Sequence, residues 1–217
     1  MTRFQLLKSI PLDELVTSVR RVPLVQKAPD GSDILVYKDA NISLHSLKPE
    51  EVNPTTFYLI KRGLQLQRDL RTYLMGEHGI DSLNLDGALE ISNSEGEIWT
   101  LTPPIIELAH REVAFIPGQG EIRYGSTFGV EIPIINDGAH RVQVARERGT
   151  KFTGLVISGI PREHPFYAHP NSWDLVRVVD ETPKTKAEKK LYLREDCYAL
   201  YRDFGVLGCG KPRHLGK

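Results

Sequence analysis

The strongest constraint on the fold is a strand, a tight turn and a short helix that follow one another in the second half of the chain. The apolar run Val130–Ile135 predicts a strand, and Asn136-Asp137-Gly138 supplies the residues of a turn. Apolar positions on one face predict a helix over 139–148, which Gly149 ends. Residues 152–160 then predict another strand, and such a unit favours a parallel or mixed sheet.

The segments before this junction also alternate between strand and helix signals. After short strand-like runs near the N-terminus, residues 53–56 supply a stop and a helix cap, and a helix of about 18 to 20 residues is expected from Phe57 to Gly76. Residues 85–102 predict a hairpin that turns at 92–96, and 104–108 predict a strand. The glycine-rich stretch 116–129 is interpreted as a long hairpin turn. The expected fold class is therefore α+β (mixed α/β), a small mixed sheet with helices packed on it.

Charge is balanced overall but unevenly placed. The chain has 217 residues, and its 28 Lys and Arg equal its 28 Asp and Glu, which excludes a globally basic protein that coats nucleic acid. Residues 184–217 hold nine basic against four acidic residues, so this end is about +5 and the rest about −5. We expect one domain over 1–183 with its core at about 40–160, followed by a basic C-terminal helix over 191–204 and a flexible tail.

Several classes of protein are excluded or disfavoured. No apolar run is long enough for a membrane span, and charges interrupt the N-terminus where a secretory signal would be apolar, so we expect a cytoplasmic protein without membrane association. Only two cysteines occur, Cys197 and Cys209, and the seven histidines are scattered. We therefore predict no structural metal site and no disulfide scaffold.

The turn at residues 137–141 is the candidate site. A turn that leads into a helix N-terminus presents free backbone N–H groups and the positive end of the helix dipole, which together bind anions. Gly138 permits close approach of a phosphate, and His140 and Arg141 add side-chain donors. A cation in the first helical turn opposes the dipole unless an anion accompanies it. The structural alternative is that Asp137 caps the helix and Arg141 points to solvent, to Glu107 or to Glu131.

At this point the sequence resembles the superfamily of ParB N-terminal domains and sulfiredoxins. The resemblance rests on the strand followed by Asp137-Gly138-Ala139-His140-Arg141, the helix that ends at Gly149 and the next strand. In organisation it extends over about 40–160, including the strand at Thr102–Ile106. It implies a ParB/sulfiredoxin-like fold in which the Gly-x-x-Arg turn holds the polyphosphate of a nucleotide.

The branches of this superfamily imply different activities. Sulfiredoxins carry a nucleophilic Cys where this chain has Ala139, so a sulfiredoxin-type reductase is excluded. ParB proteins bind CTP at the turn and clamp on DNA, but residues 161–217 lack the pattern of their helix-turn-helix region. Small-molecule kinases similar to free serine kinases share the Asp-Gly-x-x-Arg pattern that begins at Asp137, although their catalytic acid has no assignable counterpart here.

Our leading hypothesis is a nucleotide-binding protein active in phosphoryl transfer or nucleotide hydrolysis. As the resemblance implies, the ligand would be ATP, ADP or CTP with Mg²⁺, the acceptor being an unidentified small molecule or macromolecule. The nucleotide would bind Asp137, Gly138, Ala139, His140 and Arg141, of which Asp137, His140 and Arg141 would be catalytic. The alternative is a DNA-associated, ParB-like module that contacts nucleic acid through residues 184–217, with nucleotide as a switch or absent.

Overall fold

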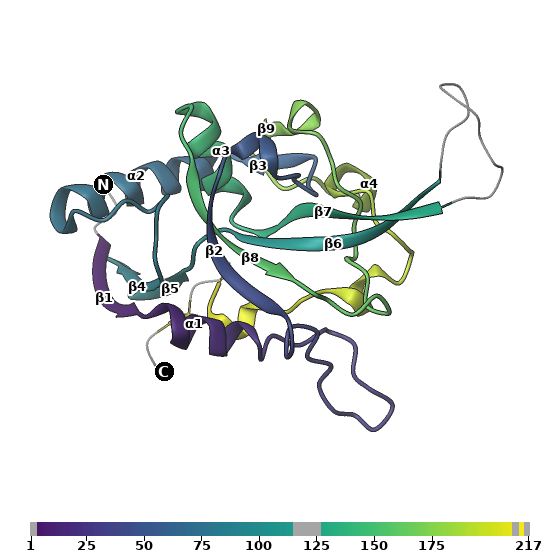
Figure 1. The fold of residues 1–217 in the computed structure, drawn as a ribbon. Helices are drawn as coiled ribbons and strands as arrows, with labels where there is room; N and C mark the ends of the chain where they lie inside the picture. Colours follow the sequence, from purple (N-terminus) through teal and green to yellow (C-terminus); the bar gives the residue numbers. More distant parts are fainter. Residues whose placement is uncertain (1–3, 115–126, 210–212, 215–217) are drawn as a thin grey trace.

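The computed structural model describes residues 4–114, 127–209 and 213–214, and they form an α+β fold (Figure 1). Its centre is a four-stranded mixed sheet with the strand order β2-β8-β6-β7. The bounds are β2 Asn41–Leu47, β6 Ile105–Ala114, β7 Thr127–Asp137 and β8 Phe152–Ser158. β6 pairs antiparallel with β7 and parallel with β8, and β2 pairs antiparallel with β8. This arrangement confirms the predicted fold class of a mixed sheet with helices.

A second four-stranded sheet has the order β1-β4-β5-β10 and lies below α2 in Figure 1. Its strands are β1 Phe4–Ile10, β4 Ala88–Asn93, β5 Glu97–Leu101 and β10 Arg213–His214, and α2 spans Lys61–His78. Apolar side chains of α2 and this sheet share one core cluster, which includes Leu70, Leu74, Leu89, Ile91 and Leu101. Removing this apolar surface from water holds α2 over the second sheet.

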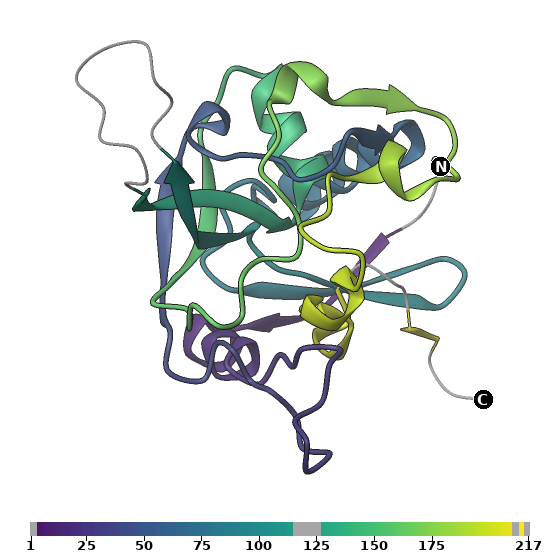
Figure 2. The ribbon, with the colours of Figure 1, turned by 90° about the vertical axis from the view of Figure 1, so that its right-hand side faces the viewer.

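The remaining elements of the described residues are short helices, 3₁₀ turns and one pair of parallel strands (Figure 2). They are α1 Leu12–Val19, α3 Ala139–Glu147, α4 Lys186–Lys189 and the parallel pair β3 Tyr58–Ile60 with β9 Arg177–Val179. Short 3₁₀ turns lie at Pro49–Glu51, Trp173–Leu175, Cys197–Leu200 and Phe204–Leu207. Among the described residues, no helix is long and apolar enough to cross a membrane.

Both faces of the central sheet are buried, because successive side chains of a strand point to opposite faces. Ile105 packs in the cluster that includes α1, whereas the next residue, Ile106, packs in the cluster that includes α2 and α3. β8 repeats this alternation with Leu155 on the first face and Val156 on the second. The apolar runs in β6 and β8 therefore reflect a sheet that is covered on two sides.

The junction that most constrained the fold forms as predicted. β7 leads through Gly138 into α3, Gly149 follows with a φ of 61°, and β8 returns to the sheet. β7 and β8 run antiparallel to each other with β6 between them, so the mixed alternative is the one adopted. The hairpin β4–β5 is also confirmed, with Gly96 at a φ of 75° in its turn. Most of the glycine-rich stretch 116–129 lies outside the described residues.

Helix α2 begins four residues later than expected and ends two residues later. The predicted start at Phe57 is wrong because residues 58–60 pair with β9, a partner far away in the sequence. The expected cap at 53–56 also fails: Ile60 is the N-cap residue, and Gly79 rather than Gly76 ends the helix, with a φ of 68°. The polar side of α2 carries the exposed Lys61 and Arg62 and an ion pair from Arg68 to Glu147.

Neither end of the chain follows the predicted local pattern. The strand-like runs near the N-terminus, 22–25 and 34–37, do not form strands: Leu24 makes one isolated bridge, with Arg202, and 34–37 makes none. The helix predicted over 191–204 is wrong, since this segment has 3₁₀ turns and extended backbone. Val25 N–H donates to the carbonyl of Tyr201, and Gln26 N–H donates to that of Ala199. The segment therefore satisfies its backbone through tertiary contacts with the N-terminal region.

Candidate functional site

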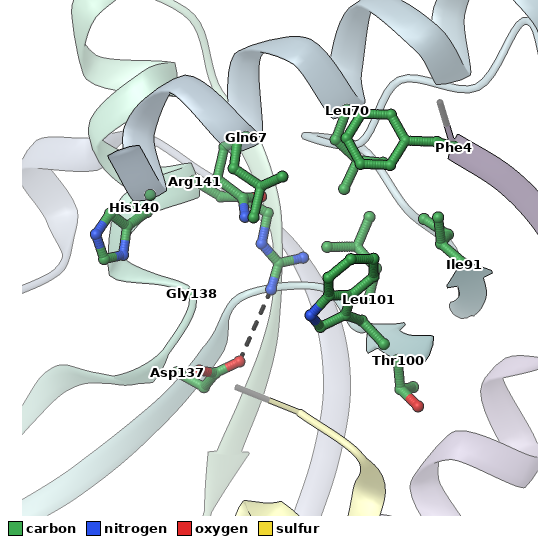
Figure 3. Close-up of a pocket in the computed structure, with 13 residues that line it drawn as sticks. Phe4, Gln67, Leu70, Ile91, Thr100, Leu101, Asp137, Gly138, His140 and Arg141 are labelled. Atoms are coloured by element: carbon green, nitrogen blue, oxygen red, sulfur yellow. Dashed lines mark ion pairs between the residues drawn. The ribbon is translucent and has the colours of Figure 1, made fainter. Parts of the chain in front are cut away.

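A cavity of about 260 Å³ lies where the β7–α3 turn meets α2 and the second sheet (Figure 3). One end of the cavity is polar and includes Asp137, Gly138, His140 and Arg141. The rest is mostly apolar and is lined from α2 by Gly63, Leu66, Gln67 and Leu70, and from the sheet by Phe4, Ile91, Trp99, Thr100 and Leu101. Four of the five residues singled out in the sequence thus line one cavity.

At the end of β7, the neighbouring polar side chains of Asn136 and Asp137 lie in different surroundings. Ile105 pairs with Asp137 and Ile106 with Ile135, so Asn136 is the extra residue of a β-bulge. Its side-chain amide donates to the hydroxyl of Tyr37 at 2.9 Å, inside the protein, whereas Asp137 lines the cavity. Bulges of this kind commonly redirect side chains beside functional sites.

Gly138 is required at its position for two reasons. Its φ is 89°, a left-handed conformation that side chains with a Cβ rarely adopt. A Cβ would also lie 2.9 Å from the Cα of Pro104. The predicted role of this glycine in a close turn is therefore consistent with the geometry.

No side chain among the described residues caps the N-terminus of α3. Gly138 occupies the N-cap position, so the alternative interpretation of Asp137 as the cap is wrong. The N–H groups of Arg141 and Val142 bond to the carbonyl of Gly138, whereas those of Ala139 and His140 precede the first intrahelical bond. Uncapped N–H groups at a helix start favour an anion.

Arg141 is buried in the wall of the cavity, with 4% of its surface exposed. Its Nη1 donates to the carbonyl of Thr102, and its Nη2 lies 3.8 Å from Oδ2 of Asp137, an ion pair longer than a hydrogen bond (Figure 3). Burial lowers the pKa of Arg141, an effect that Asp137 opposes. The side chain points neither to solvent nor to Glu107, since Glu107 is paired with Arg202.

The side chains of His140 and Ala139 each contact another part of the protein. Nε2 of His140 accepts the backbone N–H of Ile60 at 3.1 Å. Ala139 is partly buried against the core cluster that contains Val142 and Val144. A reactive side chain at position 139 would therefore face the core in this arrangement.

Sequence reasoning missed most of the cavity wall. Trp99, on β5, lines the cavity. Gln67 lines the cavity too, and its Oε1 is buried without a hydrogen-bond partner among the described residues. Gly63, inside a helix where glycine is unfavourable, was a readable signal of close packing. The apolar wall had no such signal, because its members come from four separate elements, α2, β1, β4 and β5.

Comparison with known proteins identifies the family of the chain. No curated protein and no solved structure gives a match. A model of the ParB CE domain matches residues 14–178, which is more than half of the chain and includes the β7–α3 turn and most of the cavity wall. This match confirms the resemblance to the ParB/sulfiredoxin-like superfamily, and the chain belongs to the ParB CE domain family.

Proposed function

We propose that this protein binds a nucleoside di- or triphosphate, with the phosphates at Gly138–Arg141. The observation that carries the proposal is the incomplete partnering of Arg141, a buried guanidinium beside an uncapped helix start. Burying a cation is costly unless it is paired and hydrogen-bonded. A phosphate at this end of the cavity would supply the missing acceptors and would also satisfy the first N–H groups of α3.

The other end of the cavity suits the base. Leu66 and Leu70 line it from α2, and Phe4, Ile91 and Leu101 line it from the second sheet. The unpartnered amide of Gln67 adds one polar group that a hydrogen-bonding base edge would satisfy. A cavity with a cationic end and an apolar end favours a nucleotide over inorganic phosphate.

Asp137 is the carboxylate in this wall and is suited to hold Mg²⁺ together with phosphate oxygens. Among the described residues, no group of three His, Cys, Asp or Glu could hold a metal ion alone. Mg²⁺ commonly binds through one or two carboxylates plus substrate phosphates. Phosphoryl transfer or hydrolysis would then use Asp137 to orient the metal or acceptor and Arg141 to neutralise charge on the phosphates.

The test is a thermal-unfolding panel with ATP, ADP, CTP and GTP, each with and without Mg²⁺. A ligand at 100 times its Kd should stabilise the protein by about 2.7 kcal/mol. Arg141→Gln should abolish this shift, because hydrogen bonds to a charged group contribute about 1.5 to 3 kcal/mol each. Phosphate release in the same samples would test turnover.

Arg148→Gln is the matched control for this panel. It removes the same charge from an exposed residue just after α3, outside the cavity wall. It should leave the nucleotide-induced shift unchanged. Absence of a shift with all four nucleotides, or equal shifts in Arg141→Gln and wild type, would overturn the proposal.

The alternative, DNA binding through the basic C-terminal region, is weakened by one contact. Arg202 is buried in an ion pair with Glu107 and cannot reach a phosphate backbone. Lys184 and Lys186 remain exposed. If this alternative holds, DNA affinity should fall by about 0.9 log units per log unit of salt for each phosphate contacted, and Lys184→Gln with Lys186→Gln should reduce that slope. Equal slopes would contradict it.

A further inference from the structure

The side chain of His140 forms the main polar link between the starts of two helices. His140 lies in the first turn of α3, and Ile60 is the N-cap residue of α2. The N–H of Ile60 donates to Nε2 of His140 at 3.1 Å, and the described residues include no side-chain cap for α2. Nε2 must be unprotonated to accept this bond, so it cannot donate to a phosphate at the same time.

Gly63 allows the imidazole ring to lie this close to α2. A Cβ at residue 63 would be 2.8 Å from Nε2 of His140 and 2.9 Å from its Cδ2. Glycine inside a helix is otherwise destabilising relative to alanine. Gly76, the other glycine within α2, has open space around its Cβ position. The close approach of the ring therefore gives a structural reason for glycine at 63 that does not apply at 76.

The two linked segments build opposite walls of the proposed nucleotide site. α3 begins at the turn that carries Gly138 and Arg141, and α2 contributes Gly63, Leu66, Gln67 and Leu70. Figure 3 shows the Arg141 guanidinium directed toward Asp137 while the His140 ring lies apart from both. A change in the bond from Ile60 to His140 would alter the spacing between the phosphate end and the α2 wall.

We propose that His140 is a positioning residue, which holds the phosphate-binding turn against α2 by accepting the N–H of Ile60, and is not a donor to the phosphates. The proposal deepens the proposed function, because it assigns a role within the same site. The bond joins two groups of the protein itself. It can therefore be tested even if no nucleotide binds.

The first test uses the ligand-free protein and NMR. Nitrogen chemical shifts of the ring should show Nε2 unprotonated and the proton on Nδ1, and the Ile60 amide should be protected from hydrogen exchange. Gln places an acceptor near the position of Nε2, whereas Asn is too short, so His140→Gln should retain the protection and His140→Asn should lose it. Protonated Nε2 in wild type at neutral pH, or full protection in His140→Asn, would overturn the proposal.

The second test uses the glycine pair and nucleotide affinity. Gly63→Ala should displace the ring and weaken binding of the best nucleotide by about 2- to 30-fold, the usual range for coupling through a packed contact. Gly76→Ala, in the same helix, should leave affinity unchanged. His140→Gln should bind more tightly than His140→Asn. Equal affinities of wild type, Gly63→Ala and His140→Asn would contradict the positioning role while leaving nucleotide binding intact.

The pH dependence adds a third measurement. Burial lowers the pKa of His140 from its ordinary value of 6.5; the Asp137 carboxylate opposes this and Arg141 reinforces it. On α2, the nearby charged residues Lys61 and Arg62 are exposed. Folding therefore favours the neutral ring, and stability should fall as the pH drops below about 6.5 toward the folded-state pKa. His140→Gln should flatten this part of the profile; an unchanged profile would contradict the neutral-acceptor role.

Discussion

Two buried arginines on the two sides of the β7 bulge differ in how completely they are partnered. Arg202 donates from Nε and Nη2 to the two oxygens of Glu107, at 3.0 and 2.7 Å. It also donates to the carbonyls of Leu200, Pro165 and His164. Arg141 has one bond to the carbonyl of Thr102 and a 3.8 Å ion pair with Asp137.

The difference also appears in the direction in which the pKa of each arginine is shifted. Burial alone would lower the pKa of Arg202, but Glu107 and Tyr37 together outweigh burial and the pKa is raised. At Arg141 burial outweighs Asp137, and the pKa is lowered. Arg202 is therefore a structural residue whose charge is compensated within the protein. Arg141 has a weaker internal counter-charge, which is the basis on which we propose that it binds an anion.

The largest expected effect comes from breaking the compensated pair. Glu107→Gln removes the carboxylate and leaves a buried guanidinium without its counter-charge, which should cost about 3 to 5 kcal/mol of unfolding free energy in urea denaturation. Glu147→Gln breaks the surface pair with Arg68 and is the control, expected to cost about 0 to 1 kcal/mol. Similar losses in both variants would refute the structural role of the buried pair.

A smaller effect is expected at Tyr37, which completes the shell of Glu107. Its hydroxyl donates to Oε2 of Glu107 at 2.6 Å and is fully buried. Tyr37→Phe removes one hydrogen bond to a charged group and should cost about 1.5 to 3 kcal/mol by the same denaturation measurement. Nucleotide binding should persist, since Tyr37 does not line the cavity. If Tyr37→Phe left the unfolding free energy unchanged, Arg202 alone would be sufficient to stabilise the buried Glu107 carboxylate.

The smallest effect on stability is expected at Arg141. Arg141→Met removes a poorly compensated buried charge, which should stabilise the fold, and one hydrogen bond to a carbonyl, which should destabilise it. These two effects should nearly cancel. Unfolding free energy without ligand should change by at most about 1 kcal/mol, while the nucleotide-induced shift should disappear. A loss as large as that in Glu107→Gln would place both arginines in the same structural class and would remove the basis for the proposed site.

The residues of the turn were predictable because their constraints are local. Gly138 adopts a positive φ, Gly149 ends α3, and the apolar run of β7 precedes both, so chain-adjacent signals located this junction. The start of α2 was not predictable, because the pairing of β3 with β9 overrides a helical pattern. The non-helical course of 191–204 was likewise not predictable, because Arg202 bonds to Glu107, a residue distant in the sequence.

The sequence by itself determined the strand-turn-helix junction, the α+β class and the cationic pair at the helix start, because periodicity, glycine positions and charge placement act over a few residues. Only the tertiary structure decided that Arg141 lines a cavity and that His140 turns to Ile60. It also decided that Arg202, one of the cations of the basic end, is buried. These outcomes depend on which distant acceptors a side chain meets, and chain-adjacent residues do not specify that.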